Sequence, residues 1–308
     1  MRVLILGGSG FLGSHVVDRF VAESHDVVTY DLAPERFRRT PAGVHYVTGD
    51  LGNVGALEEL VATGFDAVLH FISTTTPKTS NESPEFDITS NVVSTVHLLD
   101  ICVRHNVGKF IFLSSGGTVY GDIGDALLVD EDHPVRPICS YGVSKVSIEH
   151  YLHVYQHIHG LNYVALRISN PYGERQNPHV ALGALTVFVN RTIKRETIEI
   201  WGDGSVTRDF IYAGDVANAV YLATILPVKG IFNVGSGVGR SLRDLLREIT
   251  EVLNMKPRVV WLKARPYDVP RIVLDASKLQ AASGWSCATA LRDGIAATAE
   301  WLKRAGDF

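Results

Sequence analysis

Tyr141 and Lys145 have the side-chain types and the spacing that proton-transfer chemistry requires. Residues four apart lie on the same face of a helix, so the two side chains are expected to be neighbours. A free tyrosine titrates near pH ~10, and a lysine ammonium beside it favours the phenolate and lowers that pKa. The pair therefore predicts a tyrosine base, although a tyrosine and a lysine at this spacing also arise by chance.

The segment before this pair ends an apolar run with small and hydroxyl-bearing side chains. Residues 113–121 read Leu-Ser-Ser-Gly-Gly-Thr-Val-Tyr-Gly. Small residues leave room for a flat ring, and hydroxyl groups supply hydrogen bonds to it. The segment therefore favours the chemical interpretation of the tyrosine and lysine that follow it.

A glycine-dense turn near the N-terminus is typical of a dinucleotide-binding loop. It follows the apolar run 3–6, contains Gly7, Gly10 and Gly13, and opens an amphipathic helical pattern. Glycine lets the backbone approach a pyrophosphate closely, and a helix N-terminus offers unpaired N–H groups. Asp31 ends the next apolar run 18 positions after Gly13, close to the ~20-residue offset of a carboxylate that binds a ribose. The alternative is a tight turn that only packs a helix on a strand.

Later strand ends also carry polar residues. Asp50 follows the apolar run 44–47, and an acid there would accept a hydrogen bond from an adenine amino group or would only cap a helix or turn. The hydroxyl-rich residues 73–76 follow the run 67–72 and either line a sugar or form a polar loop. Asn91 opens a long helix with an apolar side, where a capping role is sufficient to explain it.

Strand-like and helical patterns alternate along the first half of the chain. This alternation predicts right-handed crossovers and an α/β fold with a Rossmann-type doubly wound parallel sheet, whose ligands bind at the carboxyl ends of the strands. The predicted strands are 3–6, 27–31, 44–47, 67–72, 110–114 and 163–168, and the predicted helices are 11–23, 53–62, 89–105 and 140–159.

We expect two regions in the folded chain. Residues 1–170 form the NAD-binding domain, and 205–237 return to it. Residues 171–204 and 238–308 form a smaller C-terminal α/β lobe for the substrate.

The composition excludes several classes of function. The chain has 308 residues, 46% of them hydrophobic, and its net charge of −4 gives no basic field for nucleic acid or an anionic membrane. No apolar run reaches ~18 residues and the N-terminus has no signal-peptide pattern, so no membrane span is expected. Cys102, Cys139 and Cys287 are odd in number and far apart, which predicts reduced thiols in a cytoplasmic protein.

Taken together, these motifs resemble the extended short-chain dehydrogenase/reductase family and, within it, the NAD-dependent nucleotide-sugar 4-epimerases of the UDP-glucose type. The resemblance covers nearly the full length of the chain. It implies a homodimeric enzyme that binds NAD and inverts C4 of a UDP-sugar. Besides the motifs above, it rests on residues 167–173, 199–204, 208–212, 215, 233–237 and 264–268.

The resemblance also implies a role for each matching position. Tyr141 is the base, Lys145 holds the nicotinamide ribose, and Asp31 binds the adenosine ribose and favours NAD over NADP, with Arg36, Arg38 and Arg39 close by in sequence. The implied cofactor-binding residues are Gly7, Gly10, Phe11, Leu12, Gly13, Asp31, Asp50, Leu51, Phe71, Ile72, Ser73, Ser114, Tyr141, Lys145 and Ile168.

A second set of positions matches the substrate site of the family. Asn170, Arg208 and Arg265 correspond to contacts with the diphosphate, since an arginine fork suits phosphate oxygens. On the alternative interpretation, the two arginines form surface ion pairs with neighbouring acids. The implied substrate-binding residues are Thr75, Thr118, Asn170, Glu199, Ile200, Trp201, Arg208, Arg265 and Asp268.

The chain departs from the family pattern at Gly116, where epimerases usually carry a serine or threonine that polarises the sugar 4-oxygen. Ser115 or Thr118 is expected to take over this role. The dehydratases of the family carry Asp and Glu at the positions of Gly117 and Thr118, so dehydration is not expected.

Three alternatives remain at this point. A nucleotide-sugar 4-ketoreductase would use the same base but consume NAD(P)H. A non-catalytic NAD-binding protein is expected to have lost Tyr141 or Lys145. His153 and His157 stand four apart and suggest a metal, but no further ligand accompanies them, so no metal is expected.

Overall fold

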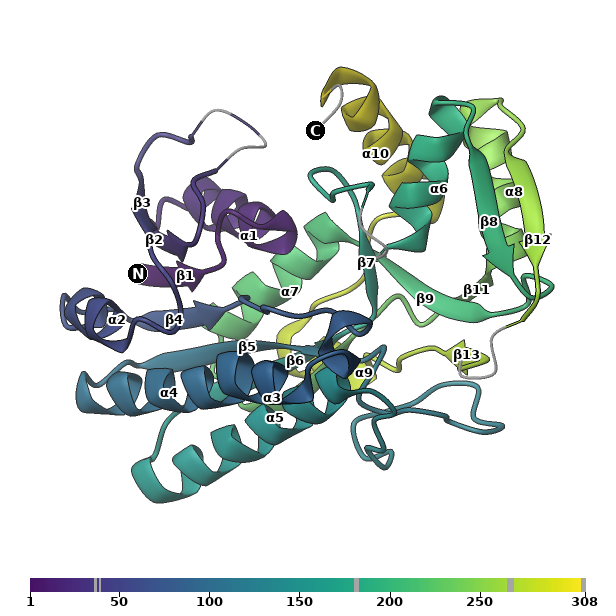
Figure 1. The fold of residues 1–308 in the computed structure, drawn as a ribbon. Helices are drawn as coiled ribbons and strands as arrows, with labels where there is room; N and C mark the ends of the chain where they lie inside the picture. Colours follow the sequence, from purple (N-terminus) through teal and green to yellow (C-terminus); the bar gives the residue numbers. More distant parts are fainter. Residues whose placement is uncertain (36–37, 39, 180–182, 265–268, 306–308) are drawn as a thin grey trace.

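Short runs of buried apolar residues form a seven-stranded parallel sheet at the centre of the larger lobe (Figure 1). The computed structural model describes the whole chain except residues 36–37, 39, 180–182, 265–268 and 306–308. The strand order is β10-β6-β5-β4-β1-β2-β3, which is the doubly wound arrangement expected from the sequence. The strands are β1 (Arg2–Leu6), β2 (Asp26–Asp31), β3 (Val44–Thr48), β4 (Ala67–His70), β5 (Lys109–Ser115), β6 (Tyr163–Ile168) and β10 (Gly230–Val234).

Helices cover both faces of this sheet because its strands are apolar on both sides. One face is covered by α1 (Phe11–Ala22), α7 (Ala213–Ile225) and α9 (Ser277–Ser283). The other face is covered by α2 (Val54–Val61), α4 (Ser94–Arg104) and α5 (Ser140–His159).

The predicted and observed boundaries differ by more than one residue at two places. The predicted strand 67–72 ends at His70, so residues 71 and 72 belong to the loop that follows it. The predicted helix 89–105 begins as a π-helix over Ile88–Val93, and the short helix α3 (Pro84–Asp87) precedes it. Asn91 therefore lies inside the π-helix and does not cap a helix.

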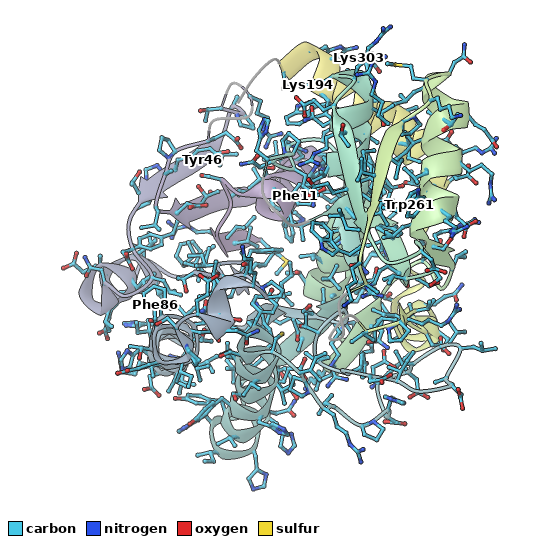
Figure 2. All side chains as sticks on the ribbon, turned by 45° about the vertical axis from the view of Figure 1, so that its right-hand side comes forward. Phe11, Tyr46, Phe86, Lys194, Trp261 and Lys303 are labelled. Carbon is cyan, nitrogen blue, oxygen red and sulfur yellow. The ribbon has the colours of Figure 1, made fainter. Side chains whose placement is uncertain are left out.

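A smaller lobe is formed by the second half of the chain (Figure 1). This lobe has an apolar core of its own, which lies among helices and two small sheets. The elements are β7 (Asn170–Tyr172), β9 (Thr207–Tyr212), β11 (Gly239–Ser241) and β13 (Arg271–Ile272) in one sheet, β8 (Thr197–Trp201) and β12 (Arg258–Leu262) in the other, and the helices α6 (Ala184–Ile193), α8 (Leu242–Leu253) and α10 (Leu291–Ala305). Figure 2 shows Trp261 on β12 of this lobe, and its side chain is exposed.

The segment 205–237 contributes to both lobes. Its strand β10 pairs with β6 in the large sheet, whereas β9 pairs with β7, β11 and β13. The assignment of this segment to the NAD-binding domain stays a prediction.

Residues 84–104 form a continuous helical run that meets the length and apolarity of a membrane span, although the sequence pattern predicted none. Half of its most apolar window is buried inside the fold, as in the core helix of a globular domain. Cys102, Cys139 and Cys287 are free thiols.

A buried ion pair ties α5 to the large sheet. Arg167 of β6 donates to the Glu149 carboxylate from Nη2 at 2.7 Å and from Nε at 3.1 Å, and both side chains are almost fully buried. Arg167 Nη1 also donates to the Tyr120 hydroxyl at 3.0 Å, and Ser114 Oγ donates to Glu149 at 2.5 Å. Each charge in this cluster is therefore compensated by a partner inside the protein.

We expect Glu149→Gln to lower the free energy of unfolding by about 3–5 kcal/mol, because it leaves the buried Arg167 guanidinium without an opposite charge. Urea unfolding followed by circular dichroism measures this loss. Glu58→Gln is the matched control, since Glu58 pairs with Arg104 on the surface and its loss is expected to change the unfolding midpoint little. Equal effects of the two substitutions would contradict the role assigned to the buried pair.

Candidate active site

Tyr141 and Lys145 lie together on the first turns of α5, as their spacing predicts. Lys145 Nζ is 5.4 Å from the centre of the Tyr141 ring and 4.7 Å from the centre of the Phe112 ring. It donates a hydrogen bond of 2.9 Å to the Leu113 carbonyl near the end of β5. The pair is therefore held at the carboxyl end of the parallel sheet, where ligands of this architecture bind.

Burial dominates the titration of both groups. It raises the pKa of Tyr141 to about 12, and a hydrogen bond with Ser73 opposes this rise only in part. Burial lowers the pKa of Lys145 to about 8, against the carboxylates of Asp87 and Glu149, which raise it. The expectation that Lys145 brings the Tyr141 pKa below its ordinary value is wrong for the protein alone, because desolvation of the phenolate is the largest cause and outweighs the hydrogen bond with Ser73.

The segment 116–118 packs tightly against the start of α5. A Cβ atom at Gly142 would stand 2.7 Å from the Thr118 carbonyl oxygen, so the residue next to Tyr141 must be glycine for the helix to approach this closely. Among the described residues, Thr118 Oγ1 is buried without a hydrogen-bond partner. A buried hydroxyl without a partner is uncommon and fits a group that awaits a ligand.

Gly116 lacks a side chain because Leu274 occupies the space. A Cβ atom at Gly116 would lie 2.4 Å from Leu274 Cδ1 and 3.1 Å from the Arg167 carbonyl oxygen. The departure from the family pattern thus has a packing cause. Ser114 is committed to Glu149, while Ser115, at the end of β5, is paired in register with Ile168 of β6.

The glycine turn closes tightly against the start of α1. Gly7 has φ +85°, and a Cβ atom at Gly13 would lie 2.0 Å from the Gly7 carbonyl oxygen. The Ser9 N–H donates to the Asp31 carboxylate at 3.1 Å, which joins the turn to the end of β2. Gly10 precedes α1, whose first residues include Phe11.

A cavity of about 240 Å³ lies beside this turn. Eight of the residues predicted to bind the cofactor line it, together with Leu32 and Thr74. Asp50 lines this cavity and also accepts a 2.7 Å hydrogen bond from the Gly52 N–H, so it holds a turn as well. The eight predicted residues are Gly7, Gly10, Asp31, Asp50, Leu51, Phe71, Ile72 and Ser73.

A larger cavity of about 710 Å³ lies in the smaller lobe. Its lining includes five predicted substrate residues, Asn170, Glu199, Ile200, Trp201 and Arg208. Asn170 Nδ2 donates to the Asp209 carbonyl at 3.0 Å, which anchors its amide at the rim of β9.

Two of the other predicted substrate residues, Thr75 and Thr118, do not line this cavity. Arg265 and Asp268 fall outside the described residues. Thr75 is buried, and its hydroxyl donates to the carboxylate of Asp87. The structure therefore gives Thr75 a partner inside the protein.

Sequence reasoning missed Asp87, which is fully buried near the Tyr141–Lys145 pair. Ser140 and Ser144 each precede one residue of the pair and have the same spacing of four. Both hydroxyls donate to Asp87, so this second spacing was the available sign of a buried acceptor. Asn91 belongs to the same group, because its amide accepts from the Thr74 N–H and donates to Asp87.

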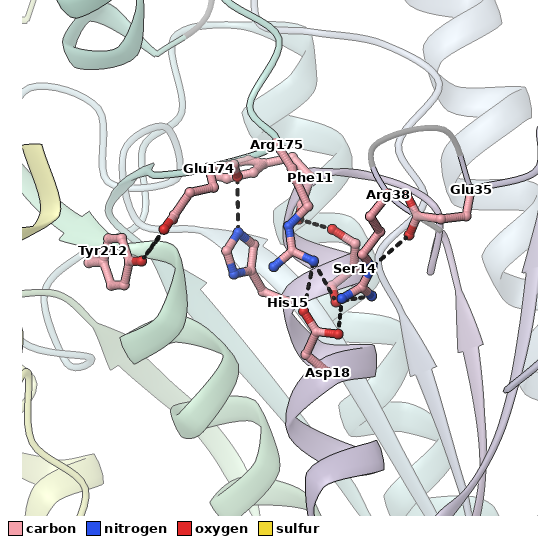
Figure 3. Close-up of polar contacts among 9 residues, drawn as sticks. All are labelled: Phe11, Ser14, His15, Asp18, Glu35, Arg38, Glu174, Arg175 and Tyr212. Carbon is pink, nitrogen blue, oxygen red and sulfur yellow. Dashed lines mark hydrogen bonds and ion pairs between the residues drawn. The ribbon is translucent and has the colours of Figure 1, made fainter. Parts of the chain in front are cut away.

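A second missed cluster joins α1 to the segment after β7 (Figure 3). Asp18 of α1 accepts from Arg175 at 2.7 Å and also from Arg38. The His15 Nε2–H donates to the Glu174 carbonyl at 3.0 Å, and burial lowers the pKa of His15 to about 3, so the ring stays neutral. The helix that opens at the glycine turn is thereby fixed to the loop that leads into the smaller lobe.

The arginines after Asp31 bear on the choice of dinucleotide. The guanidinium of Arg38 is engaged by Asp18 and by the Ser14 carbonyl. Arg36 and Arg39 lie outside the described residues. Within the part of the chain that the structure describes, no group of three or more histidine, cysteine or acidic side chains is arranged to hold a metal ion.

Comparison with known proteins gives consistent matches over the whole chain. A family model described as "NAD dependent epimerase/dehydratase family" matches residues 3–235. A putative UDP-glucose 4-epimerase of Methanocaldococcus jannaschii is 34% identical over 302 residues, which are 98% of each chain. The crystal structure of Thermus thermophilus UDP-glucose 4-epimerase in complex with NAD superposes with a TM-score of 0.93 at 35% identity, covering 99% of this chain and 100% of that one. A UDP-N-acetylglucosamine 4-epimerase of Methanobrevibacter ruminantium superposes with a TM-score of 0.91 at 28% identity, covering 98% of both.

We expect Gly13→Ala to weaken NAD binding at least ~10-fold, because the added methyl group forces the Gly7 carbonyl and the glycine turn apart. Isothermal titration calorimetry with NAD measures the change. Gly55→Ala in α2 is the matched control, since its Cβ would meet no atom closer than 3.9 Å and alanine suits a helix interior. Wild-type affinity in the Gly13→Ala protein would contradict the assignment of this turn.

Proposed function

The chain belongs to the NAD-dependent epimerase/dehydratase family, and we propose that it inverts C4 of a UDP-sugar through a transient 4-keto sugar. The observation that carries the proposal is the Tyr141–Lys145 pair at the carboxyl end of the sheet, accompanied by two cavities in which most of the predicted cofactor and substrate residues gather. The similar proteins named above are epimerases of UDP-sugars, which supports the UDP-sugar class for the substrate.

The residues around the smaller cavity fit NAD, the cofactor of this family. Gly7 and Gly10 of the turn line this cavity without side chains of their own. Helix α1 begins directly after Gly10, and the first N–H groups of a helix have no partner within the helix. The Asp31 carboxylate suits two ribose hydroxyls and repels a 2′-phosphate, so NAD is favoured over NADP. The engagement of Arg38 with Asp18 also keeps that guanidinium occupied.

When bound, NAD supplies the hydride acceptor and donor and the positive charge of an oxidised nicotinamide. Tyr141 takes the proton from the sugar 4-hydroxyl and later returns it. Lys145 stabilises the phenolate and holds the nicotinamide ribose. Burial raises the Tyr141 pKa, and the positive charge that an oxidised nicotinamide would add beside the tyrosine favours the phenolate.

Thr118 is the group we assign to the sugar 4-oxygen. Its hydroxyl is buried without a partner among the described residues, and its backbone contacts the helix turn that carries Tyr141. Ser115 is the second candidate, since it stands at the end of β5. One of these hydroxyls replaces the one absent at Gly116.

The larger cavity is assigned to the nucleotide part of the substrate. Arg208 presents a guanidinium that suits the diphosphate, and Asn170 offers an amide beside it. Glu199, Ile200 and Trp201 on the end of β8 border the uracil. Binding energy from this remote part holds the sugar ring while its 4-keto form turns over.

We also propose that the enzyme is a homodimer. Exposed apolar side chains lie along α5, where Val154 is 43% and Ile158 64% exposed, and Val93 beside α4 is 40% exposed. Such a surface on two neighbouring helices suits a contact with the same helices of a second copy.

The reaction is tested by incubating the purified protein with UDP-glucose or UDP-N-acetylglucosamine and following the galacto product by NMR. We expect the product without net change at the absorbance band of reduced nicotinamide, because the hydride returns to the sugar. Steady consumption of NAD(P)H with a 4-keto sugar would identify a ketoreductase instead.

In the same assay Tyr141→Phe is expected to lower kcat by about 10²–10⁴-fold, because it removes the proton acceptor without changing the shape of the ring. Tyr151→Phe on the exposed side of α5 is the matched control and is expected to keep the wild-type rate. Full activity in the Tyr141→Phe protein would remove the assigned base.

We expect kcat/KM for epimerisation to fall as the pH rises through about 8, because Lys145 loses its proton there and no longer stabilises the phenolate. The pH dependence of initial rates measures this limb. Lys145→Arg keeps a charge that does not titrate in this range, so its residual activity should lack the limb. A Lys145→Arg profile that falls at the same pH would assign the limb to another group.

A further inference from the structure

The carboxylate of Asp87 is fully buried beside Tyr141 and Lys145. Its oxygens accept hydrogen bonds from the Asn91 amide at 3.0 Å, the Ser140 hydroxyl at 3.1 Å and the Ser144 hydroxyl at 2.6 Å. The Thr75 hydroxyl is the fourth donor. Such a group costs free energy to bury, so its four donors call for a functional explanation.

The two serines connect Asp87 to the residues on either side of the proposed chemistry, Tyr141 and Lys145. Ser140 precedes Tyr141 and Ser144 precedes Lys145, so each chemical side chain is one residue away from a hydroxyl that is bonded to the same oxygen, Asp87 Oδ2. The rotation of the first turn of α5 about its own axis is thereby fixed against α3.

The backbone of α5 is held at the same place. The Ser140 N–H donates to Asn81 Oδ1 at 2.9 Å, and the Tyr141 N–H donates to Ser80 Oγ at 3.0 Å. These bonds satisfy two of the N–H groups that a helix start leaves unpaired. Residues 80–87 therefore hold the start of α5 in place through hydrogen bonds to its backbone and to its serine hydroxyls.

Asp87 also faces the charge of Lys145. Asp87, Tyr141 and Lys145 line one cavity of about 10 Å³, the size of a single water molecule. The titratable groups that face Lys145 are Asp87 from α3, Glu149 and Tyr141 from α5, and His70 from β4, which is buried and neutral. Glu149 is already paired with Arg167. Among the described residues, Asp87 is therefore the carboxylate facing Lys145 that has no ion pair of its own.

We propose that Asp87 is a positioning residue that aligns Tyr141 and Lys145 through the hydroxyls of Ser140 and Ser144 and balances the ammonium of Lys145. This inference rests on the proposed function only where it is tested by the rate of epimerisation. Asp87 touches neither the substrate nor the cofactor in this role.

The charge of Asp87 shifts the pKa values of both residues in one direction. Asp87 raises the pKa values of both Lys145 and Tyr141, so removal of its charge lowers both. The pH–rate profile is therefore expected to move to lower pH, with the alkaline limb below its wild-type position. A purely structural support would lower thermal stability and leave the profile where it is.

The test is Asp87→Asn, which keeps the shape of the side chain and removes the charge. We expect kcat to fall about 10²-fold at neutral pH through misalignment of the base, and the alkaline limb to shift to lower pH. Ser144→Ala removes one hydrogen bond and keeps the carboxylate, so it is expected to lower kcat without moving the limb. Ser147→Ala is the matched control, because among the described residues its hydroxyl donates only to the Val143 carbonyl of its own helix.

A second readout does not need the reaction. In protein labelled with ¹³C-lysine, the Cε signal of Lys145, assigned by its loss in Lys145→Arg, titrates with the ammonium. We expect its midpoint to fall in Asp87→Asn and to stay in Ser147→Ala. If neither the Lys145 midpoint nor the pH profile moves in Asp87→Asn, the proposed role of Asp87 is overturned. If the midpoint shifts but the wild-type protein epimerises no UDP-sugar, the role of Asp87 stands and only the proposed function is rejected.

Discussion

The fold takes the ammonium of Lys145 out of water, and much of the candidate site follows from the need to compensate that charge. An ammonium in a low-dielectric interior gives up its proton unless oxygen atoms surround it. Here the Leu113 carbonyl at the end of β5 accepts its hydrogen bond, and the carboxylates of Asp87 and Glu149 raise its pKa against burial. One strand and two helices thus supply these oxygens, and the glycine at position 142 allows α5 to come close enough to residue 118.

The architecture could be predicted from the sequence because its signals are local. Apolar runs of strand length, glycines at the first turn and helical periodicity are all patterns within a few neighbouring residues. They gave six of the seven strands of the large sheet, and the helices α1, α2 and α5, within a few residues of their observed ends. The spacing of Tyr141 and Lys145 is local in the same sense. Their common orientation is therefore confirmed.

What the sequence did not reveal depends on contacts between distant segments. Asp87 meets Ser144 across 57 positions, and Asp18 meets Arg175 across 157, so no spacing rule connects them. The direction of the Tyr141 pKa shift was predicted wrongly for a related reason. Spacing shows that a charge is near, but only the packed structure shows how far the phenol is removed from water. The glycine at position 116 likewise becomes intelligible only once Leu274 is seen to fill the space beside it.

The π turn between α3 and α4 determines the phase of one helix relative to the other. An ordinary helix advances about 100° for each residue, and a π turn accommodates about one residue more than an α turn does. If the same six residues of Ile88–Val93 were wound as a regular α-helix, Asp87 would swing about 100° around the axis, away from Ser140 and Ser144. The wide winding of this segment, matched to its length, is therefore what a homologue must preserve to keep the buried aspartate against the helix that carries the tyrosine and the lysine.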